Sequence, residues 1–185
     1  ANAGMSLTGG WRQTTSYQNG LYSVSDVDSF GREVSRTDLG GHVTSYSYDT
    51  MGRLTQLAGG GATTSFTNLN TGLLGASVRS EGGAVWSGTY GYDVAGNRTA
   101  EHYQHTAGGI TTVYQNATAS YDALGRMTQW NEAGSAAMPI ASISYLYDAN
   151  SNVRRVYTQH RLLDVSGNAT SMIETKDQWF RYDAM

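Results

Sequence analysis

The strongest constraint on the fold is a short motif, Y-D-x-x-G-(R/N)-x-T, which recurs along the 185-residue chain. Complete or nearly complete copies occupy residues 48–55, 92–99, 121–128 and 147–153, and looser copies occupy 27–32, 68–73 and 163–170. The copies follow one another at intervals of about 22 residues. A unit this short has room for two strands and two turns but not for a helical crossover. The repeat therefore predicts an all-β chain built from hairpins.

Each copy of the motif has the residues of a tight hairpin turn. Asp followed three residues later by Gly is typical of a type I turn, in which the carboxylate accepts backbone N–H groups and Gly adopts the left-handed conformation of a three-residue loop with a bulge. In this register Asp49 faces Arg53 and Tyr48 faces Leu54. The fourth copy has Ser151 where Gly is expected, which predicts local strain or a different turn type.

The predicted site is structural and consists of the motif residues themselves. The aspartates are expected to pair across the mouth of each hairpin with the Arg or Asn four positions on. The motif residues that make up this predicted structural site are Tyr48, Asp49, Gly52, Arg53, Tyr92, Asp93, Gly96, Asn97, Tyr121, Asp122, Gly125, Arg126, Tyr147, Asp148, Asn152, Asp164, Gly167, Tyr182 and Asp183.

Composition excludes several classes of protein. The chain has no Cys, so it cannot contain disulfides or thiolate zinc sites. A net charge of −3 disfavours a nucleic-acid-binding surface, and the sequence has no apolar run of membrane-spanning length. No signal peptide is recognisable in residues 1–10. Flanking segments alternate with period two, as strands do, so that Ile143, Tyr145 and Tyr147 share one face.

The Y-D-x-x-G-(R/N)-x-T repeat resembles that of the RHS/YD-repeat family, found in bacterial polymorphic toxins, insecticidal toxin complexes and animal teneurins. The resemblance runs from about residue 25 to the C-terminus. It implies a continuous antiparallel sheet of hairpins that curves or spirals into part of a hollow β-shell, with residues 1–185 as a single segment of the array. The last residues begin a further copy at Tyr182, so we expect the array to continue.

The resemblance also implies a function. In bacterial members the shell encloses a C-terminal toxin, so the expected role is a non-enzymatic wall, secreted or at the cell surface. Its expected partners are the rest of its own repeat chain and an encapsulated toxin domain, with self-association through open sheet edges. No cofactor, nucleic acid or membrane span is expected. The self-cleaving D-P dipeptide of some members has no counterpart, since the lone proline, Pro139, follows Met138.

Other patterns favour turns or packing over chemistry. Asp26 and Asp28, with Gly31, resemble the start of a calcium loop, but Thr37 stands where a bidentate Glu is needed. His102 and His105 would point to opposite faces of a strand, which is poor geometry for zinc. His42 and His160 have no evident partner. No motif of a catalytic nucleophile or of a phosphate-binding loop is present, and the Gly59–Gly61 and Gly108–Gly109 runs are expected to form long hairpin tips. The sequence predicts no catalytic, cofactor-binding or metal-binding residues.

One alternative function stays open. Tyr and Trp rings on regular strand faces, Trp86 and Tyr90 among them, are suited to stacking on sugars, so a cell-surface adhesion or carbohydrate-binding module is the second hypothesis. The competing interpretation is that these rings pack between neighbouring strands, where each can bury roughly 150–250 Å².

Overall fold

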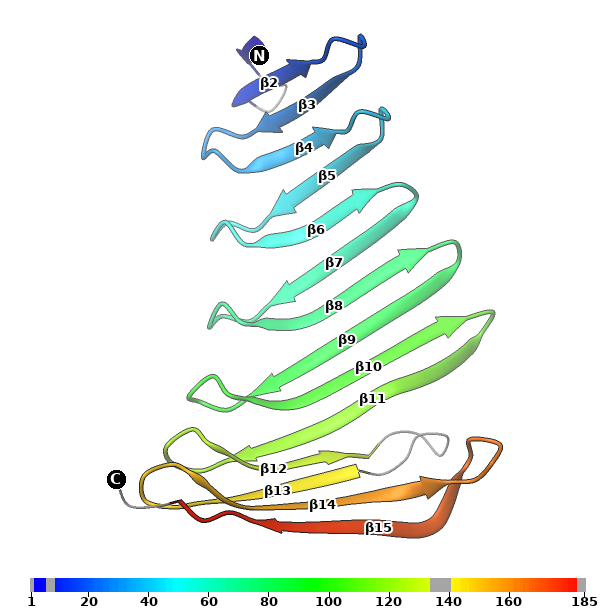
Figure 1. Ribbon diagram of the computed structural model, residues 1–185. Coiled ribbons are helices and arrows are strands. Elements are labelled where there is room, and N and C mark those ends of the chain that lie inside the picture. The colour runs from blue at the N-terminus through cyan, green and yellow to red at the C-terminus, as the bar shows by residue number, and fades with distance from the viewer. Residues whose placement is uncertain (1, 6–8, 134–140, 183–185) are drawn as a thin grey trace. The chain divides into compact units, whose positions relative to one another are not determined.

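A computed structural model describes residues 2–5, 9–133 and 141–182 as strands joined by turns (Figure 1). The strands are β1 (Asn2–Met5), β2 (Trp11–Ser16), β3 (Tyr22–Val27), β4 (Glu33–Thr37), β5 (Val43–Tyr48), β6 (Leu54–Gly59), β7 (Ala62–Asn68), β8 (Leu74–Glu81), β9 (Ala84–Tyr92), β10 (Arg98–Ala107), β11 (Ile110–Tyr121), β12 (Met127–Glu132), β13 (Ala141–Tyr147), β14 (Val153–Leu163) and β15 (Ala169–Trp179). None of the described residues belongs to a helix with the length and hydropathy of a membrane span.

The predicted all-β antiparallel fold is confirmed. Within each compact unit the strands follow one another in the sheet in the order in which they occur in the chain. The chain divides into two compact units, Ala1–Val85 and Trp86–Met185. In the first, β2 pairs with β3 from Trp11 opposite Val27 to Ser16 opposite Tyr22. In the second, β13 pairs with β14 and β14 with β15, all antiparallel.

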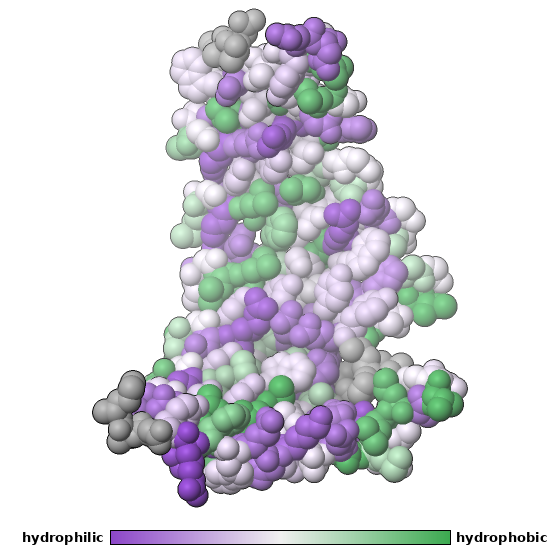
Figure 2. Space-filling view, in the orientation of Figure 1, coloured by the Kyte–Doolittle hydropathy of each residue, from purple (hydrophilic) through white to green (hydrophobic). Residues whose placement is uncertain are grey.

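Each unit is a single layer with very little interior. Among the described residues, the buried apolar side chains are Ala62 and Ala117, and the buried polar ones are Asp26, Asp28 and Glu132. Figure 2 shows hydrophobic and hydrophilic residues interspersed over the visible face. Since no second layer of secondary structure packs on the strands that the structure describes, each hairpin depends on its neighbours in the sheet.

The Tyr-Asp turns have the geometry that the motif predicts. In the β5–β6 turn the N–H of Gly52 donates to the carbonyl of Asp49 at 3.0 Å, and the N–H of Asp49 donates to the carbonyl of Arg53 at 2.9 Å. Gly52 has φ +81°, and the strand register shifts between Ser47 and Tyr48, so that Tyr48 lies opposite Leu54. This is a type I turn closed by a bulge with a left-handed glycine.

Alternate turns lie at opposite ends of the strands, and this separates the copies of the motif into two groups. In the first unit the Asp28, Asp49 and Leu69 turns share one end; in the second unit the Asp93, Asp122 and Asp148 turns do so. The Asp164 turn joins β14 to β15 and therefore lies at the other end of its unit. The looser copy at 163–170 thus keeps the turn geometry but does not lie at the same end of the strands as the other Tyr-Asp turns of its unit.

A further turn of the same kind was missed in the sequence. The N–H of Gly41 donates to the carbonyl of Asp38, and the Asp38 carboxylate accepts the N–H groups of Gly40 and His42. The His42 ring lies 3.2 Å from that carboxylate, so the expectation that His42 has no partner was wrong. His160 likewise lies 3.3 Å from Glu174 on the neighbouring strand. The sequence signal for the turn at Asp38 was D-x-x-G without a preceding Tyr.

The glycine pairs form shorter loops than expected. Gly60 and Gly61 join β6 to β7 with φ +61° and +80°, and Gly108 and Gly109 join β10 to β11 with φ +57° and +78°. Two consecutive residues at positive φ form a two-residue hairpin loop of the primed type. The expectation of long hairpin tips was therefore wrong, because paired glycines permit the tightest connection between strands.

Ser151 confirms the strain expected from the missing glycine. It has φ +67°, and no other described non-glycine residue has a positive φ. The turn keeps its type, since the N–H of Ser151 donates to the carbonyl of Asp148 as Gly52 does to Asp49. The left-handed conformation costs an L-residue roughly 1–2 kcal/mol.

We predict that Ser151→Gly raises the free energy of unfolding by about 0.5–1 kcal/mol, because relief of strain exceeds the loss of one side-chain hydrogen bond. Urea denaturation of the purified chain measures this change. The matched control is Gly125→Ser at the same position of the preceding turn, where φ is +74°. Gly125→Ser should lower the free energy of unfolding by about 1 kcal/mol. Equal stability of all three proteins would contradict the strain assignment.

Candidate functional site: contacts between successive Tyr-Asp turns

Within each turn that has an aspartate at its first position, one carboxylate organises the loop. The Oδ1 atom of Asp122 accepts the N–H groups of Leu124 at 2.9 Å and Arg126 at 3.0 Å, and its Oδ2 accepts Nε of Arg126 at 2.7 Å. Asp28 and Asp49 make the same three bonds in their own turns. One side chain thus satisfies two backbone donors and one cation, which fixes the turn and the rotamer of the Arg together.

Asparagine replaces arginine in the other turns of this kind. The Nδ2 atoms of Asn97, Asn152 and Asn168 donate to the carboxylates of Asp93, Asp148 and Asp164 at 2.9, 3.0 and 3.3 Å. The pairing across the hairpin mouth therefore has the predicted register in both variants. Asp183 lies outside the described residues, and Tyr182, which precedes it, is half exposed.

The carboxylates are held in their ionised form by these contacts. The side-chain hydrogen bond from Arg126 lowers the pKa of Asp122, and the bond from Asn97 lowers the pKa of Asp93. The backbone N–H of Arg53 is the leading cause of the lowered pKa of Asp49. Acid protonates these aspartates and so removes the ionised acceptor that each turn depends on. Acid therefore weakens the turns.

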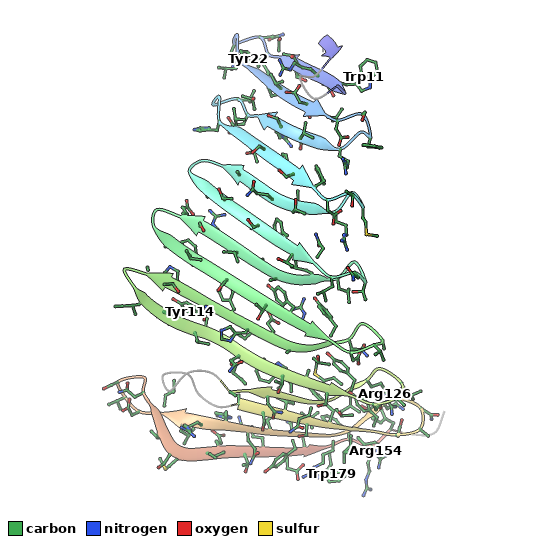
Figure 3. All side chains as sticks on the ribbon, turned by 180° about the vertical axis from the view of Figure 1, so that it is seen from behind. Trp11, Tyr22, Tyr114, Arg126, Arg154 and Trp179 are labelled. Carbon is green, nitrogen blue, oxygen red and sulfur yellow. The ribbon has the colours of Figure 1, made fainter. Side chains whose placement is uncertain are left out.

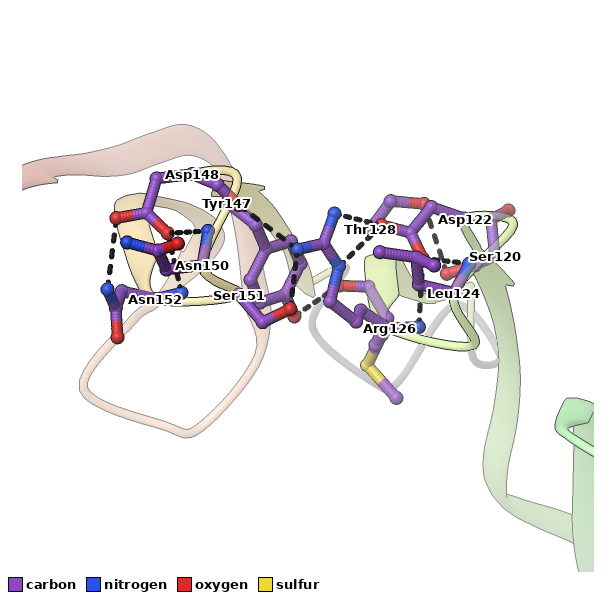
Figure 4. Close-up of polar contacts among 11 residues, drawn as sticks. Ser120, Asp122, Leu124, Arg126, Thr128, Tyr147, Asp148, Asn150, Ser151 and Asn152 are labelled. Carbon is purple, nitrogen blue, oxygen red and sulfur yellow. Dashed lines mark hydrogen bonds and ion pairs between the residues drawn. The ribbon is translucent and has the colours of Figure 1, made fainter.

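The arginine of one turn also binds the next turn. The guanidinium carbon of Arg126 lies 4.6 Å from the centroid of the Tyr147 ring, while Nη1 donates to the Asp148 carbonyl at 3.2 Å and to Ser151 Oγ at 3.1 Å (Figure 4). A cation above an aromatic face is stabilising by about 0.5–1 kcal/mol at exposed sites. Arg126 is therefore shared between two consecutive hairpins.

The tyrosine of the later turn returns the contact. The Tyr147 hydroxyl donates to the carbonyl of Met127, the residue after Arg126, at 2.7 Å, and its burial raises the pKa of that hydroxyl. The Tyr121 hydroxyl reaches the Arg98 carbonyl, the residue after Asn97, at 2.9 Å. In both cases a motif tyrosine bonds the position just after the Arg or Asn of the preceding turn.

The first unit has the same arrangement. The Arg32 guanidinium lies 4.7 Å from the Tyr48 ring centroid, and the Tyr48 hydroxyl donates to the Glu33 carbonyl at 2.7 Å. The Asp28 carboxylate accepts a hydrogen bond from Nε of Arg32, as Asp122 does from Nε of Arg126. The contact is thus a property of the motif and not of one location.

The degenerate copy at 68–73 preserves the contact with different side chains. Asn68 stands where the tyrosine is missing, and its Nδ2 donates to the Leu54 carbonyl at 2.9 Å. Nη1 of Arg53 donates to the Leu69 carbonyl, as Arg126 does to Asp148. The role of Asn68 could not be predicted from the sequence, because an amide donor that replaces a phenol hydroxyl is recognised only when the two turns are seen side by side.

Two positions depart from the pattern. Asn97 is too short to reach a neighbouring ring, and the next residue, Arg98, lies 4.8 Å from the Tyr90 ring centroid and bonds Glu101. In the β14–β15 hairpin, which lacks a motif arginine, Arg155 pairs with Asp177 through two bonds and lies 5.1 Å from both Tyr157 and Trp179. The residues of this Arg155 cluster do not belong to the motif and were not predicted as site residues.

The residues considered for metal or sugar chemistry have other contacts. Asp26 forms a two-bond ion pair with Arg12, so both carboxylates of the calcium-like segment are engaged by arginines. His102 bonds Gln104, whereas His105 stacks on Trp86 with ring centroids 4.6 Å apart. Among the described residues no three His, Asp or Glu side chains gather as metal ligands would.

Comparison with known proteins agrees with this geometry. Residues 27–64, which contain the Asp28 and Asp49 turns, match the family model RHS Repeat. Residues 27–64 are thus similar to an RHS repeat. No curated protein matches the sequence.

Solved structures share the fold. One is the crystal structure of TcdB2-TccC3, with a TM-score of 0.61, 17% identity and coverage of 97% of this chain and 11% of that one. Another is the Photorhabdus luminescens Tc holotoxin pore with the TccC3-D651A mutation, with a TM-score of 0.54, 17% identity and coverage of 94% and 11%. The chain therefore spans about a tenth of the length of these two chains.

We predict that the stability of the chain falls below about pH 4. The ordinary carboxyl pKa is 3.8, and the turn aspartates titrate lower than this when folded. The unfolded chain then binds more protons, so stabilisation is complete above the unfolded pKa and is lost as the pH falls through the folded pKa. Urea midpoints measured between pH 7 and 2.5 should decline over the acid range. Asp122→Asn should show a smaller decline, and an identical decline in both proteins would contradict the assignment.

Proposed function

We propose that this chain is one structural segment of a longer RHS/YD-repeat array whose wall encloses a C-terminal toxin or effector domain. The observation that carries the proposal is the contact between successive turns, in which Arg126 binds Tyr147 and the Tyr147 hydroxyl binds the Met127 carbonyl. Because each hairpin completes the site of the one before it, the same contact can extend along an array of any length.

The single-layer architecture supports a role as a wall. A sheet with so few buried apolar side chains leaves both faces available, one to enclose and one to meet solvent. The similarity to TcdB2-TccC3 over 97% of the chain supplies the fold of such a segment. The role is structural rather than catalytic, and the partners are the rest of the array and its cargo.

We place the protein outside the cell or at the surface of a bacterium, in keeping with the toxin-complex chains that share its fold. Terminal strands of a segment also present unpaired backbone groups, so that the isolated segment associates through its edges.

The carbohydrate-binding alternative is less well supported at the two rings first considered. The Trp86 ring is stacked on His105 at an interplanar angle of 20°, and the Tyr90 ring is covered by Arg98. Both rings therefore pack against side chains of this chain, as the competing interpretation holds.

The test is limited proteolysis of the full-length protein from which this segment comes, followed by mass spectrometry. We expect the region C-terminal to the array to resist cleavage until the wall opens. In a double variant that combines Arg126→Ala with Tyr147→Leu, that region should be cleaved at a lower protease concentration than in the parent protein. The control, Arg36→Ala at an exposed arginine, should leave the pattern unchanged. Equal cleavage of the C-terminal region when free and when attached, or a full-length product with no such region, would contradict enclosure.

A further inference from the structure

The turn between β2 and β3 has the backbone of a Tyr-Asp turn without its aspartate. The N–H of Gly20 donates to the carbonyl of Tyr17 at 3.0 Å, the N–H of Tyr17 donates to the carbonyl of Leu21 at 2.8 Å, and Gly20 has φ +80°. The turn lies beside Tyr22, an exposed residue at the start of β3 that Figure 3 labels. In this Tyr17 turn (residues 17–21), tyrosine therefore occupies the position that Asp49 has in its own turn.

The side chain of Asn19 takes over part of the role of the missing carboxylate. Its Oδ1 accepts the N–H of Leu21 at 3.2 Å. In the Asp49 turn the corresponding N–H, that of Arg53, donates to the aspartate at 2.9 Å. Because Oδ1 reaches an N–H two residues further on, the Asn19 side chain folds back along the Asn19–Gly20 peptide bond and brings its Cγ toward the Gly20 nitrogen.

The sequence places the least hindered nitrogen next to this side chain. Asn19 is the only asparagine of the chain that is followed by glycine. Glycine has no Cβ, so its nitrogen meets little steric resistance when it approaches the Asn19 side chain. The N–H of Leu21 stabilises negative charge that develops on Oδ1 during such an attack. Asn19 is exposed, and water therefore reaches the reacting atoms.

The amide nitrogen of Asn19 is free to leave. Within the part of the chain that the structure describes, Nδ2 of Asn19 has no hydrogen-bond acceptor. The amides of Asn97, Asn152 and Asn168, by contrast, donate to the aspartates of their own turns. An amide that is held by a carboxylate must give up this bond before its nitrogen departs, so these three side chains are protected where Asn19 is not.

We propose that Asn19 is a site of spontaneous deamidation. The Gly20 nitrogen loses its proton to a base in the solvent and attacks Cγ of Asn19. The new C–N bond closes a succinimide ring, the bond between Cγ and Nδ2 breaks, and the amide nitrogen takes up a proton and leaves as ammonia. Water then opens the ring at one of its two carbonyls, which yields aspartate or isoaspartate at position 19. The proposal does not rest on enclosure of a cargo.

The missing carboxylate decides where this reaction occurs. Attack requires that the Gly20 N–H first release the carbonyl of Tyr17, which opens the turn. In the Asp49 turn the carboxylate also holds the N–H groups of Met51 and Arg53, and opening would break those bonds as well. The Tyr17 turn has no such carboxylate, so its local opening costs less free energy.

The experiment is incubation of the purified chain at neutral pH and physiological temperature, followed by tryptic peptide mapping. Asn19 is the only asparagine of the peptide 13–32, whose mass should rise by one dalton, and a protein isoaspartyl methyltransferase should label the isoaspartate product. Tyr17→Asp restores the carboxylate and should slow the reaction about fivefold. The matched control, Gln18→Glu, adds the same charge at an exposed position of this turn and should react like the parent.

A second measurement uses the parent chain alone. The rate at each asparagine is divided by its rate in urea, which removes the effect of the following residue. We expect this ratio to be about fivefold higher for Asn19 than for Asn168, which is also exposed but donates its amide to Asp164. Asn168 is the only asparagine of the tryptic peptide 162–176. In urea, where no turn is present, Tyr17→Asp and the parent should react at equal rates.

Each of four results would overturn the proposal. They are no mass gain in the peptide 13–32 of the folded parent, an unchanged rate in folded Tyr17→Asp, an equal slowing in Gln18→Glu, and a ratio for Asn19 no higher than that for Asn168. Circular dichroism verifies that each variant keeps its β-structure. If Tyr17→Asp loses its structure, the comparison of Asn19 with Asn168 in the parent decides.

Discussion

The side-chain contact between successive Tyr-Asp turns, made by a shared guanidinium at Arg32, Arg53 and Arg126, is the interaction that ties the sequence of this chain to the order of its hairpins. A single-layer sheet has almost no interior, so the burial that stabilises an ordinary domain is small here. Backbone ladders hold neighbouring strands together but are indifferent to sequence. Arg126, fixed by Asp122 on one side and lying over Tyr147 on the other, couples the sequence of one hairpin to the position of the next.

The departures from the motif show which parts of the contact matter. Where tyrosine is absent, Asn68 supplies the donor to the Leu54 carbonyl, so the hydrogen bond is retained although the ring is not. Where arginine is absent, Asn97 keeps the aspartate contact within its own turn, and Tyr121 still bonds the Arg98 carbonyl. The bond between a motif side chain and the carbonyl of the preceding turn is thus more constant than the cation–aromatic contact.

The hairpins could be predicted from the sequence because each is encoded locally. Asp49, Gly52 and Arg53 lie within five residues, and turn chemistry alone dictates their bonds. The contact of Arg126 with Tyr147 could not be predicted, because it joins residues on different hairpins whose spacing in the chain varies. The Asp38 turn was missed since it lacks the tyrosine, and with it the pairing of His42. The bulge at Tyr114 has no local signature, because nothing in the sequence of β11 distinguishes it from a regular strand.

The most direct test of the shared guanidinium is a double-mutant cycle between Arg126→Met and Tyr147→Leu, with free energies of unfolding from urea denaturation. Both replacements keep apolar bulk while removing the cation or the ring. We expect the two single changes to be non-additive by about 0.5–1 kcal/mol, the size of an exposed cation–aromatic contact. A coupling energy of zero would contradict the account, because Arg126 and Tyr147 would then stabilise the chain independently of each other.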